Sequence, residues 1–148
     1  MKVRICDEII DLSHVIAFWT KDNGIHFATE TAGNQFLHVP KGITAQDVFE
    51  TVDKLDEGLV EVLPGTLVRV SMIACVYKTN GNDNQITFSF KRGSDLYHTS
   101  KENKRRIDFE RICAAMTDSI TNVDQVFEDL VKQRSEGLGS RLKALVTK

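Results

Sequence analysis

The chain has 148 residues, of which 41% are hydrophobic and 27% are charged. This composition is typical of a globular protein rather than a disordered one, and the length suits one domain whose core needs no disulfide or metal. No apolar stretch approaches the roughly 20 residues of a membrane helix, and the net charge of −2 gives no general attraction to nucleic acid or membranes.

The first half of the chain predicts four strands and then a helix. The strands are expected near residues 3–6, 9–20, 25–30 and 35–39. Asp22-Asn23-Gly24 is a tight-turn sequence, because Asn and Gly tolerate positive φ, and Pro40 ends the fourth strand because it lacks a ladder amide. The helix begins at Thr44, which caps it together with Asp47, and Gly58 ends it. Its apolar stripe consists of Val48, Val52, Leu55 and Leu59.

The second half predicts the same order of elements. Its strands are expected near residues 59–63, 66–78, 85–91 and 95–99, and its helix runs from 103 to 119. Ile86, Phe88 and Phe90 alternate with polar residues, which is typical of a half-buried antiparallel strand. The expected buried face of the helix consists of Phe109, Ile112, Cys113, Met116 and Ile120.

Sparse matches between the halves indicate an internal repeat. Ile16-Ala17 falls on Ile73-Ala74, Ile25-His26-Phe27 on Ile86-Thr87-Phe88, and Phe36-Leu37-His38 on Leu96-Tyr97-His98. We therefore predict a single α+β domain, residues 1–148, built from two tandem ββββα repeats, 1–58 and 59–120. The repeats form antiparallel sheet with the helices packed on one side, plus an extra C-terminal helix.

Residues 121–148 form the predicted helical extension. One side of its helix is apolar, through Val123, Val126, Phe127, Leu130 and Val131. Gly137 and Gly139 are expected to break this helix. The segment 140–148 that follows suits a short terminal helix, and packing, fraying and docking all remain open for it.

The cysteines and the N-terminal segment predict a cytoplasmic protein. Residues 1–8 contain no uninterrupted apolar run, so we expect no signal peptide there. Cys6, Cys75 and Cys113 are odd in number, far apart and set in apolar segments, which is typical of reduced core thiols. None has a histidine or a basic cluster beside it that would activate the thiol.

Catalytic and metal-binding motifs are not found in the sequence. The four histidines lack the close spacing of a zinc site, and neither a phosphate-binding glycine loop nor a Gly-x-Ser-x-Gly elbow is present. We expect no cofactor and no metal. His38 and His98 occupy matching positions of the two halves, so a hydrolase that uses both is the least favoured interpretation. His98-Thr99-Ser100 fits the motif of two-histidine phosphoesterases, but His38-Val39-Pro40 does not.

Charge is spread unevenly along the chain. Residues 1–74 carry six basic and eleven acidic side chains, a net of −5, whereas residues 75–148 carry thirteen and ten, a net of +3. Such a molecule can pair head to tail with itself, present one basic face, or simply have a solvated surface. The candidate nucleic-acid patch consists of Lys91, Arg92, Tyr97, Lys101, Lys104, Arg105 and Arg106, which offers phosphate contacts and a stacking aromatic.

Two family resemblances follow from the order of elements. Each half resembles the FlbD flagellar regulator family and the core of the LytTR DNA-binding domain. Residues 59–73 have the length of the closing LytTR motif, although Leu63-Pro64-Gly65 stands where that family has His-Arg-Ser. The doubled ββββα topology is also similar to the PUR and Whirly proteins, which bind single-stranded nucleic acid on curved sheets. These resemblances imply nucleic-acid binding, and no site residue is carried over from them.

Taken together, these patterns favour a non-catalytic binding regulator that acts through protein–protein contacts. The partner surface is expected on the strand near 9–20, where Phe18 or Trp19 is exposed, or on the acidic first half. Nucleic-acid binding through the basic cluster is the alternative. The protein partner is unknown, no membrane partner is expected, and a homodimer remains open.

Overall fold

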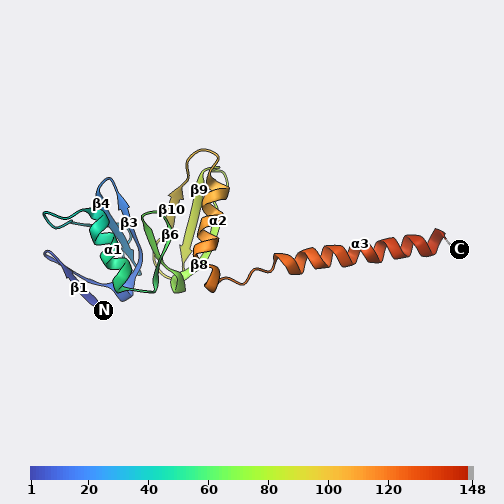
Figure 1. Ribbon diagram of the computed structural model, residues 1–148, viewed down its shortest axis with the longest axis horizontal. Coiled ribbons are helices and arrows are strands. Elements are labelled where there is room, and N and C mark those ends of the chain that lie inside the picture. Colours follow the sequence, from blue (N-terminus) through green and yellow to red (C-terminus); the bar gives the residue numbers. More distant parts are fainter. Residues whose placement is uncertain (147–148) are drawn as a thin grey trace.

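The computed structural model describes residues 1–146, with side chains through Gly137. Its first half contains β1 (Lys2–Ile5), β2 (Glu8–Asp11), η1 (Leu12–His14), β3 (Val15–Lys21), β4 (Gly24–Thr29), β5 (Gln35–Leu37) and α1 (Ala45–Leu55). Its second half contains β6 (Leu59–Leu63), β7 (Thr66–Arg69), η2 (Val70–Met72), β8 (Ile73–Lys78), β9 (Gln85–Phe90), β10 (Leu96–Thr99), α2 (Arg105–Ala115), η3 (Thr117–Ser119) and α3 (Asp124–Val146). The predicted α+β class is confirmed, with antiparallel sheets and packed helices (Figure 1).

Each half has five strands rather than the predicted four. The two long strands expected near 9–20 and 66–78 are each interrupted by a 3₁₀ turn, η1 and η2. In the first half, the Asp11 carboxylate accepts a hydrogen bond from the Ser13 amide at 3.1 Å, which satisfies a backbone group that a continuous ladder would have paired. A hairpin, a 3₁₀ turn, a three-stranded meander and a helix therefore follow one another in both halves. The division into repeats 1–58 and 59–120 stays a prediction.

The hairpin of the second half completes the sheet of the first half. The five-stranded sheet has the order β5-β4-β3-β7-β6, while β8, β9 and β10 form a separate three-stranded sheet and β1 pairs only with β2 among the described strands. β7 runs antiparallel to β3, with Phe18 opposite Leu67 and Trp19 opposite Thr66. β3 is consequently a central strand with neighbours on both edges.

Two buried clusters lie against opposite faces of β3 and β7. Phe18 and Leu67 point into the cluster under α1, whereas Ala17 and Val68 point into the cluster that contains α2. Successive strand residues face opposite sides of a sheet, so one pair of strands supplies both cores. Large members of the first cluster are Ile25, Leu37, Phe49 and Val52, and those of the second are Ile86, Phe88, Phe90 and Ile112.

An arginine on β7 forms hydrogen bonds that join the two halves. The Nε atom of Arg69 donates to the Val15 carbonyl at 2.8 Å, and its Nη2 atom donates to the Leu12 carbonyl at 2.5 Å and to Asp56 Oδ2 at 2.6 Å. The Arg69 side chain is 13% exposed and that of Asp56 is 20% exposed. The hydrogen bond from Arg69 holds the pKa of Asp56 below its ordinary value, against the opposing effect of burial.

The predicted start of the first helix is confirmed. Thr44 Oγ1 accepts a hydrogen bond from the Asp47 amide at 3.1 Å, and Asp47 Oδ2 accepts one from the Thr44 amide at 2.9 Å. This capping box satisfies two amides that the first turn leaves free. Val48 and Val52 are buried as expected, but Leu55 is 44% exposed and Leu59 belongs to β6.

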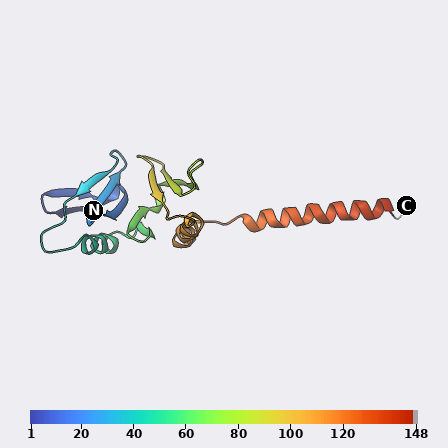
Figure 2. The same cartoon turned by 90° about the horizontal axis from the view of Figure 1, so that it is seen from above.

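The third helix differs from its prediction and stands apart from the rest of the chain. α3 runs unbroken from Asp124 to Val146, so Gly137 and Gly139 do not end it, because glycine lowers helix stability without forbidding the conformation. The predicted segment 140–148 is therefore part of α3 as far as Val146, and residues 147–148 lie outside the described residues. Figures 1 and 2 show α3 pointing away from the sheets at the end of a short linker.

Candidate binding surfaces

The two candidate catalytic histidines do not occupy matching positions. In the first meander Leu37 pairs with Ile25, and in the second His98 pairs with Ile86, so Leu37 is the counterpart of His98 and His38 lies one residue further on. His38 is exposed beside the Phe36 ring. His98 instead bonds Asp108 of α2 through Nε2 at 3.0 Å. The two halves therefore contain no matching pair of histidines, which the hydrolase interpretation required.

The carboxyl group that binds His98 is also held in its charged form. Burial raises the pKa of Asp108, but the nearby Ser100 side chain and the hydrogen bond with the His98 ring outweigh this effect, so its pKa lies below the ordinary value. Asp108 therefore tethers β10 to the start of α2. His98 therefore has a structural role in this contact.

The prediction that Phe18 is available to a partner is wrong. Its side chain is 1% exposed because it packs in the core under α1, beside Phe49 and Leu67. Trp19 points to the other face, is partly buried, and stacks on His26 at a ring-centroid distance of 5.8 Å. The sequence pattern could not reveal that a strand from the other half would cover this edge.

The predicted basic patch is divided in the structure. Lys91 and Arg92 lie in the turn between β9 and β10, whereas Lys101 and Lys104 follow the opposite end of β10. The Arg105 guanidinium is engaged by the loop before β9, where Nη1 donates to the carbonyls of Thr79 at 3.2 Å and Asn82 at 2.7 Å. Tyr97 and Arg106 are exposed. Arg105 is therefore a structural residue, and the remaining basic residues form two groups.

Basic side chains gather at one of these groups. Lys101, Lys104 and Arg111 line a hollow of about 480 Å³ beside His98 and Asp108. Asp108 supplies a negative charge on its wall, and Arg111 Nη1 lies 3.9 Å from it. The hollow is thus less positive than the sequence suggested.

Aromatic side chains occupy the same register in both meanders. Phe36 on β5 and Tyr97 on β10 are the counterparts, because they pair with His26 and Thr87 respectively. Phe36 is 52% exposed and Tyr97 is 57% exposed. The Phe36 ring lies edge-on to the His26 ring at 5.4 Å. These two rings are flat apolar surfaces open to solvent on the outer strand of each meander.

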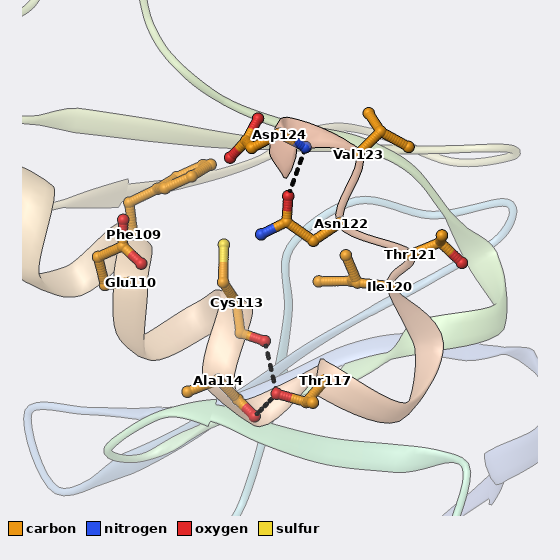
Figure 3. Close-up of a pocket in the computed structure, with 10 residues that line it drawn as sticks. All are labelled: Phe109, Glu110, Cys113, Ala114, Thr117, Ile120, Thr121, Asn122, Val123 and Asp124. Carbon is orange, nitrogen blue, oxygen red and sulfur yellow. Dashed lines mark hydrogen bonds between the residues drawn. The ribbon is translucent and has the colours of Figure 1, made fainter. Parts of the chain in front are cut away.

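Another hollow lies between α2 and the linker to α3. Its volume is about 530 Å³, and Phe109, Cys113 and Asn122 are among its lining residues (Figure 3). Burial, followed by the charge of Glu110, raises the pKa of the Cys113 thiol, which keeps it protonated. Cys6 and Cys75 are exposed, contrary to the expected core thiols, because they lie in the β1–β2 turn and on a sheet-edge strand.

An extended apolar surface lies on α3. Val123, just before the helix, and the apolar side chains of its first two turns are spaced three and four residues apart, so they form one stripe. This α3 stripe consists of Val123, Val126, Phe127, Leu130 and Val131, with exposed fractions of 47%, 56%, 58%, 39% and 64%. Every residue from Asp124 to Gly137 is exposed. The stripe therefore has no covering surface among the described residues.

Two further kinds of feature were sought among the described residues, metal-binding side-chain groups and membrane-spanning helices. Within the part of the chain that the structure describes, no three His, Cys, Asp or Glu side chains form a group suited to a metal ion. Among residues 1–146, no helix is both long and apolar enough to cross a membrane.

Comparison with known proteins yields structural likeness alone. No protein-family model and no curated protein matches the chain. The chain is similar to the LytTr DNA-binding domain of a methyl-accepting/DNA response regulator from Bacillus cereus, with 16% identity and a TM-score of 0.44. The match covers 76% of this chain and 94% of that domain. At this level the likeness carries no argument about function.

Proposed function

We propose that the protein is a non-catalytic binding protein that acts through protein–protein contacts, with the α3 stripe as its main contact surface. The observation that supports this proposal is the exposure of a long amphipathic helix. A helix of 23 residues spans about 34 Å, yet an isolated helix is only marginally stable in water. Its stability therefore comes from packing its apolar side against another surface.

The chemistry of the stripe defines the kind of partner. Phe127 and Leu130 supply the large apolar anchors, and acidic residues such as Glu128 and Asp129 flank them. This arrangement suits an apolar groove, or another amphipathic helix, that is rimmed by basic residues. Helices recognised in this way bind through anchors spaced three, four and seven residues apart.

The test compares two variants of the full chain with equal charge changes. Phe127→Asp with Leu130→Asp removes the anchors, while Gln125→Asp with Lys132→Gln alters the opposite face of α3 by the same two charge units. Immobilised wild type and control are expected to capture the same protein from an extract of the source cells, and the stripe variant at least about tenfold less. Equal capture by the two variants, no captured protein, or capture of nucleic acid alone contradicts the proposal.

A second candidate function is single-stranded nucleic-acid binding, favoured by the exposed rings of Phe36 and Tyr97. Aromatic side chains on sheets stack with bases, and each stack contributes about 1–3 kcal/mol. Lys101 and Lys104 would then contact phosphates. Binding of a labelled oligonucleotide should weaken on raising salt, with a log–log slope of about −1.4 for two contacts. Loss of binding in Phe36→Ala and Tyr97→Ala, but not in the stripe variant, would support this function over the first.

A further inference from the structure

In the contact between the two halves of the chain, the first half accepts a hairpin strand from the second half. β7, from the hairpin of the second half, pairs with the edge of β3 in the first half. β8 takes the place of β3 in the second half, and its outer edge pairs with no strand among residues 1–146. β2 takes the place of β7, and among those residues it pairs with β1 alone. The chain thus carries one open acceptor edge and one open donor edge.

The ladders fix which residues correspond. A bulge lies between Val15 and Ala17 on β3, and another lies between Ile73 and Cys75 at the same point of β8. In the hairpins, Val3 faces Ile10 as Val60 faces Val68. On the acceptor strands, Ala17, Phe18 and Trp19 of β3 correspond to Cys75, Val76 and Tyr77 of β8. On the donor strands, Thr66, Leu67 and Val68 of β7 correspond to Glu8, Ile9 and Ile10 of β2.

Two residues that are buried at this contact have exposed counterparts at the open edges, whereas Ile10, the counterpart of Val68, is already buried in its own half. Leu67 and Ala17 are both 0% exposed at the existing contact. Their counterparts differ sharply, because Ile9 is 73% exposed and Cys75 is also exposed. Tyr77, the counterpart of the partly buried Trp19, is 43% exposed. Both open edges therefore present apolar side chains where the existing contact covers them.

Charges at the two open edges are complementary in this register. Residue 65 lies beside Thr20 in the existing contact, since the Thr20 amide donates to the Gly65 carbonyl at 3.0 Å. The corresponding neighbours at a new contact are Asp7 and Lys78, with Glu8 opposite Tyr77. Residues 1–58 carry five basic and ten acidic side chains, a net of −5, and residues 59–120 carry nine and seven, a net of +2. The donor edge is acidic and the acceptor half is basic.

In the second half, a hollow lies at the position that corresponds to the partners of Arg69. Arg69 lies among Leu12, Val15 and Asp56 in the first half. Val70 and Ile73 are the counterparts of Leu12 and Val15, and Met116 follows α2 as Asp56 follows α1. These three residues line an open hollow of about 510 Å³, together with Lys91. The residue that would enter it is Asp11, the counterpart of Arg69. An Asp11–Lys91 pair would thus replace the Arg69–Asp56 pair with the charges exchanged.

We propose that β2 of a second copy of this chain pairs antiparallel with β8, so that copies associate head to tail. The occupant of the open edge is the β1–β2 hairpin, held in the register that β7 has on β3. Such an interface is heterologous, so each copy keeps one free donor edge and one free acceptor edge, and copies add in series or close into a ring. This inference concerns a different surface from the α3 stripe and goes beyond the proposed function.

The first test uses two variants that each block one edge. Ile9→Lys blocks the donor edge and Cys75→Lys blocks the acceptor edge, and both residues are exposed, so the fold tolerates the change. Ile107→Lys, at a side chain 45% exposed on α2, is the control. All are measured by sedimentation velocity at tens of micromolar, in the wild-type chain and in the Phe127→Asp, Leu130→Asp background that removes the α3 stripe.

Wild type and control should sediment as species larger than a dimer, and each blocked variant as a monomer. An equimolar mixture of the two blocked variants should form a one-to-one dimer and nothing larger, because it holds one intact donor edge and one intact acceptor edge. A monomeric wild type overturns the proposal. So does self-association that Cys75→Lys abolishes and Ile9→Lys leaves intact, since that result indicates two β8 edges paired with each other.

The second test probes the register without depending on the blocked variants. In a chain with Cys6, Cys75 and Cys113 changed to Ser, Glu8→Cys in one copy should form a disulfide with Tyr77→Cys in another, because directly opposed strand residues have Cβ atoms about 5 Å apart. Ala74→Cys is the matched control, three residues away on the same strand. A covalent dimer with Tyr77→Cys and at least tenfold less with Ala74→Cys is expected. Equal yields with the two partners contradict the register.

Discussion

Replacing Arg69 with Met tests whether the hydrogen bonds and ion pair of this side chain hold the two halves together. Methionine keeps the apolar length of the side chain, so the loss reports the guanidinium group. The change leaves the Asp56 carboxylate, 20% exposed, without its partner and removes donors from the carbonyls of Leu12 and Val15. Breaking a buried ion pair costs about 3–5 kcal/mol, and partial exposure of Asp56 places this loss near the lower end. Loss of the hydrogen-bond donor to the two carbonyl groups adds about 1 kcal/mol, so the free energy of unfolding should fall by about 4 kcal/mol in all.

Urea unfolding followed by fluorescence measures this loss. The chain has one tryptophan, Trp19, which is partly buried and stacked on His26, so its emission reports the packing of β3. With an m-value of about 2 kcal/mol/M, the midpoint should fall by about 2 M. Arg69→Met combined with Asp56→Leu should recover part of the stability, because no unpaired charge is then buried. A single variant within 1 kcal/mol of wild type, or a double variant that is less stable than Arg69→Met, refutes the reasoning.

Three further predictions concern the folded state. The pKa of Asp56 is lowered by Arg69, so this carboxylate stabilises the fold above its unfolded pKa of about 3.9 and loses that effect as pH falls through its lower folded pKa. The urea midpoint of Asp56→Asn should therefore depend less on pH below about pH 5 than that of wild type. Thr44→Ala should lower the free energy of unfolding by about 1 kcal/mol through loss of the cap, whereas Thr31→Ala serves as an exposed control; equal effects would contradict the capping argument. Phe18→Ala should destabilise the chain by about 3–5 kcal/mol, and a change in partner capture without loss of stability would restore Phe18 as a contact residue.

Local sequence patterns predicted most helices and strands, while contacts between distant residues determined strand pairing and side-chain burial. The Asp22-Asn23 turn has positive φ at both residues, 52° and 60°, and the Thr44 cap forms as its side chains dictate. Pairing of β7 with β3 was not visible in either segment, and neither was the packing of α1 over the face of β3 that carries Phe18. The counterpart of His98 was misplaced by one residue, because only the ladder of β9 and β10 shows which side chains are opposed.

The surface residues were the hardest to predict because exposure and contact depend on the whole chain. The basic cluster looked continuous in sequence, yet β10 separates Lys91 from Lys101 and the loop before β9 engages Arg105. The apolar spacing of α3 was visible from the start. Its lack of a covering surface within the described chain was not, and this feature supports a partner.

Hydrogen exchange of α3, with and without a bound partner, shows whether this helix is the contact surface. In the dilute, unbound protein, the amides of residues 124–137 should exchange within seconds to minutes, because no residue of this segment is buried. On adding the protein captured by wild type, these amides should exchange at least about tenfold more slowly, while those of the loop at 80–84 keep their rates. Protection of α3 that is already complete in the dilute protein, or no change on adding the captured protein, would contradict the account.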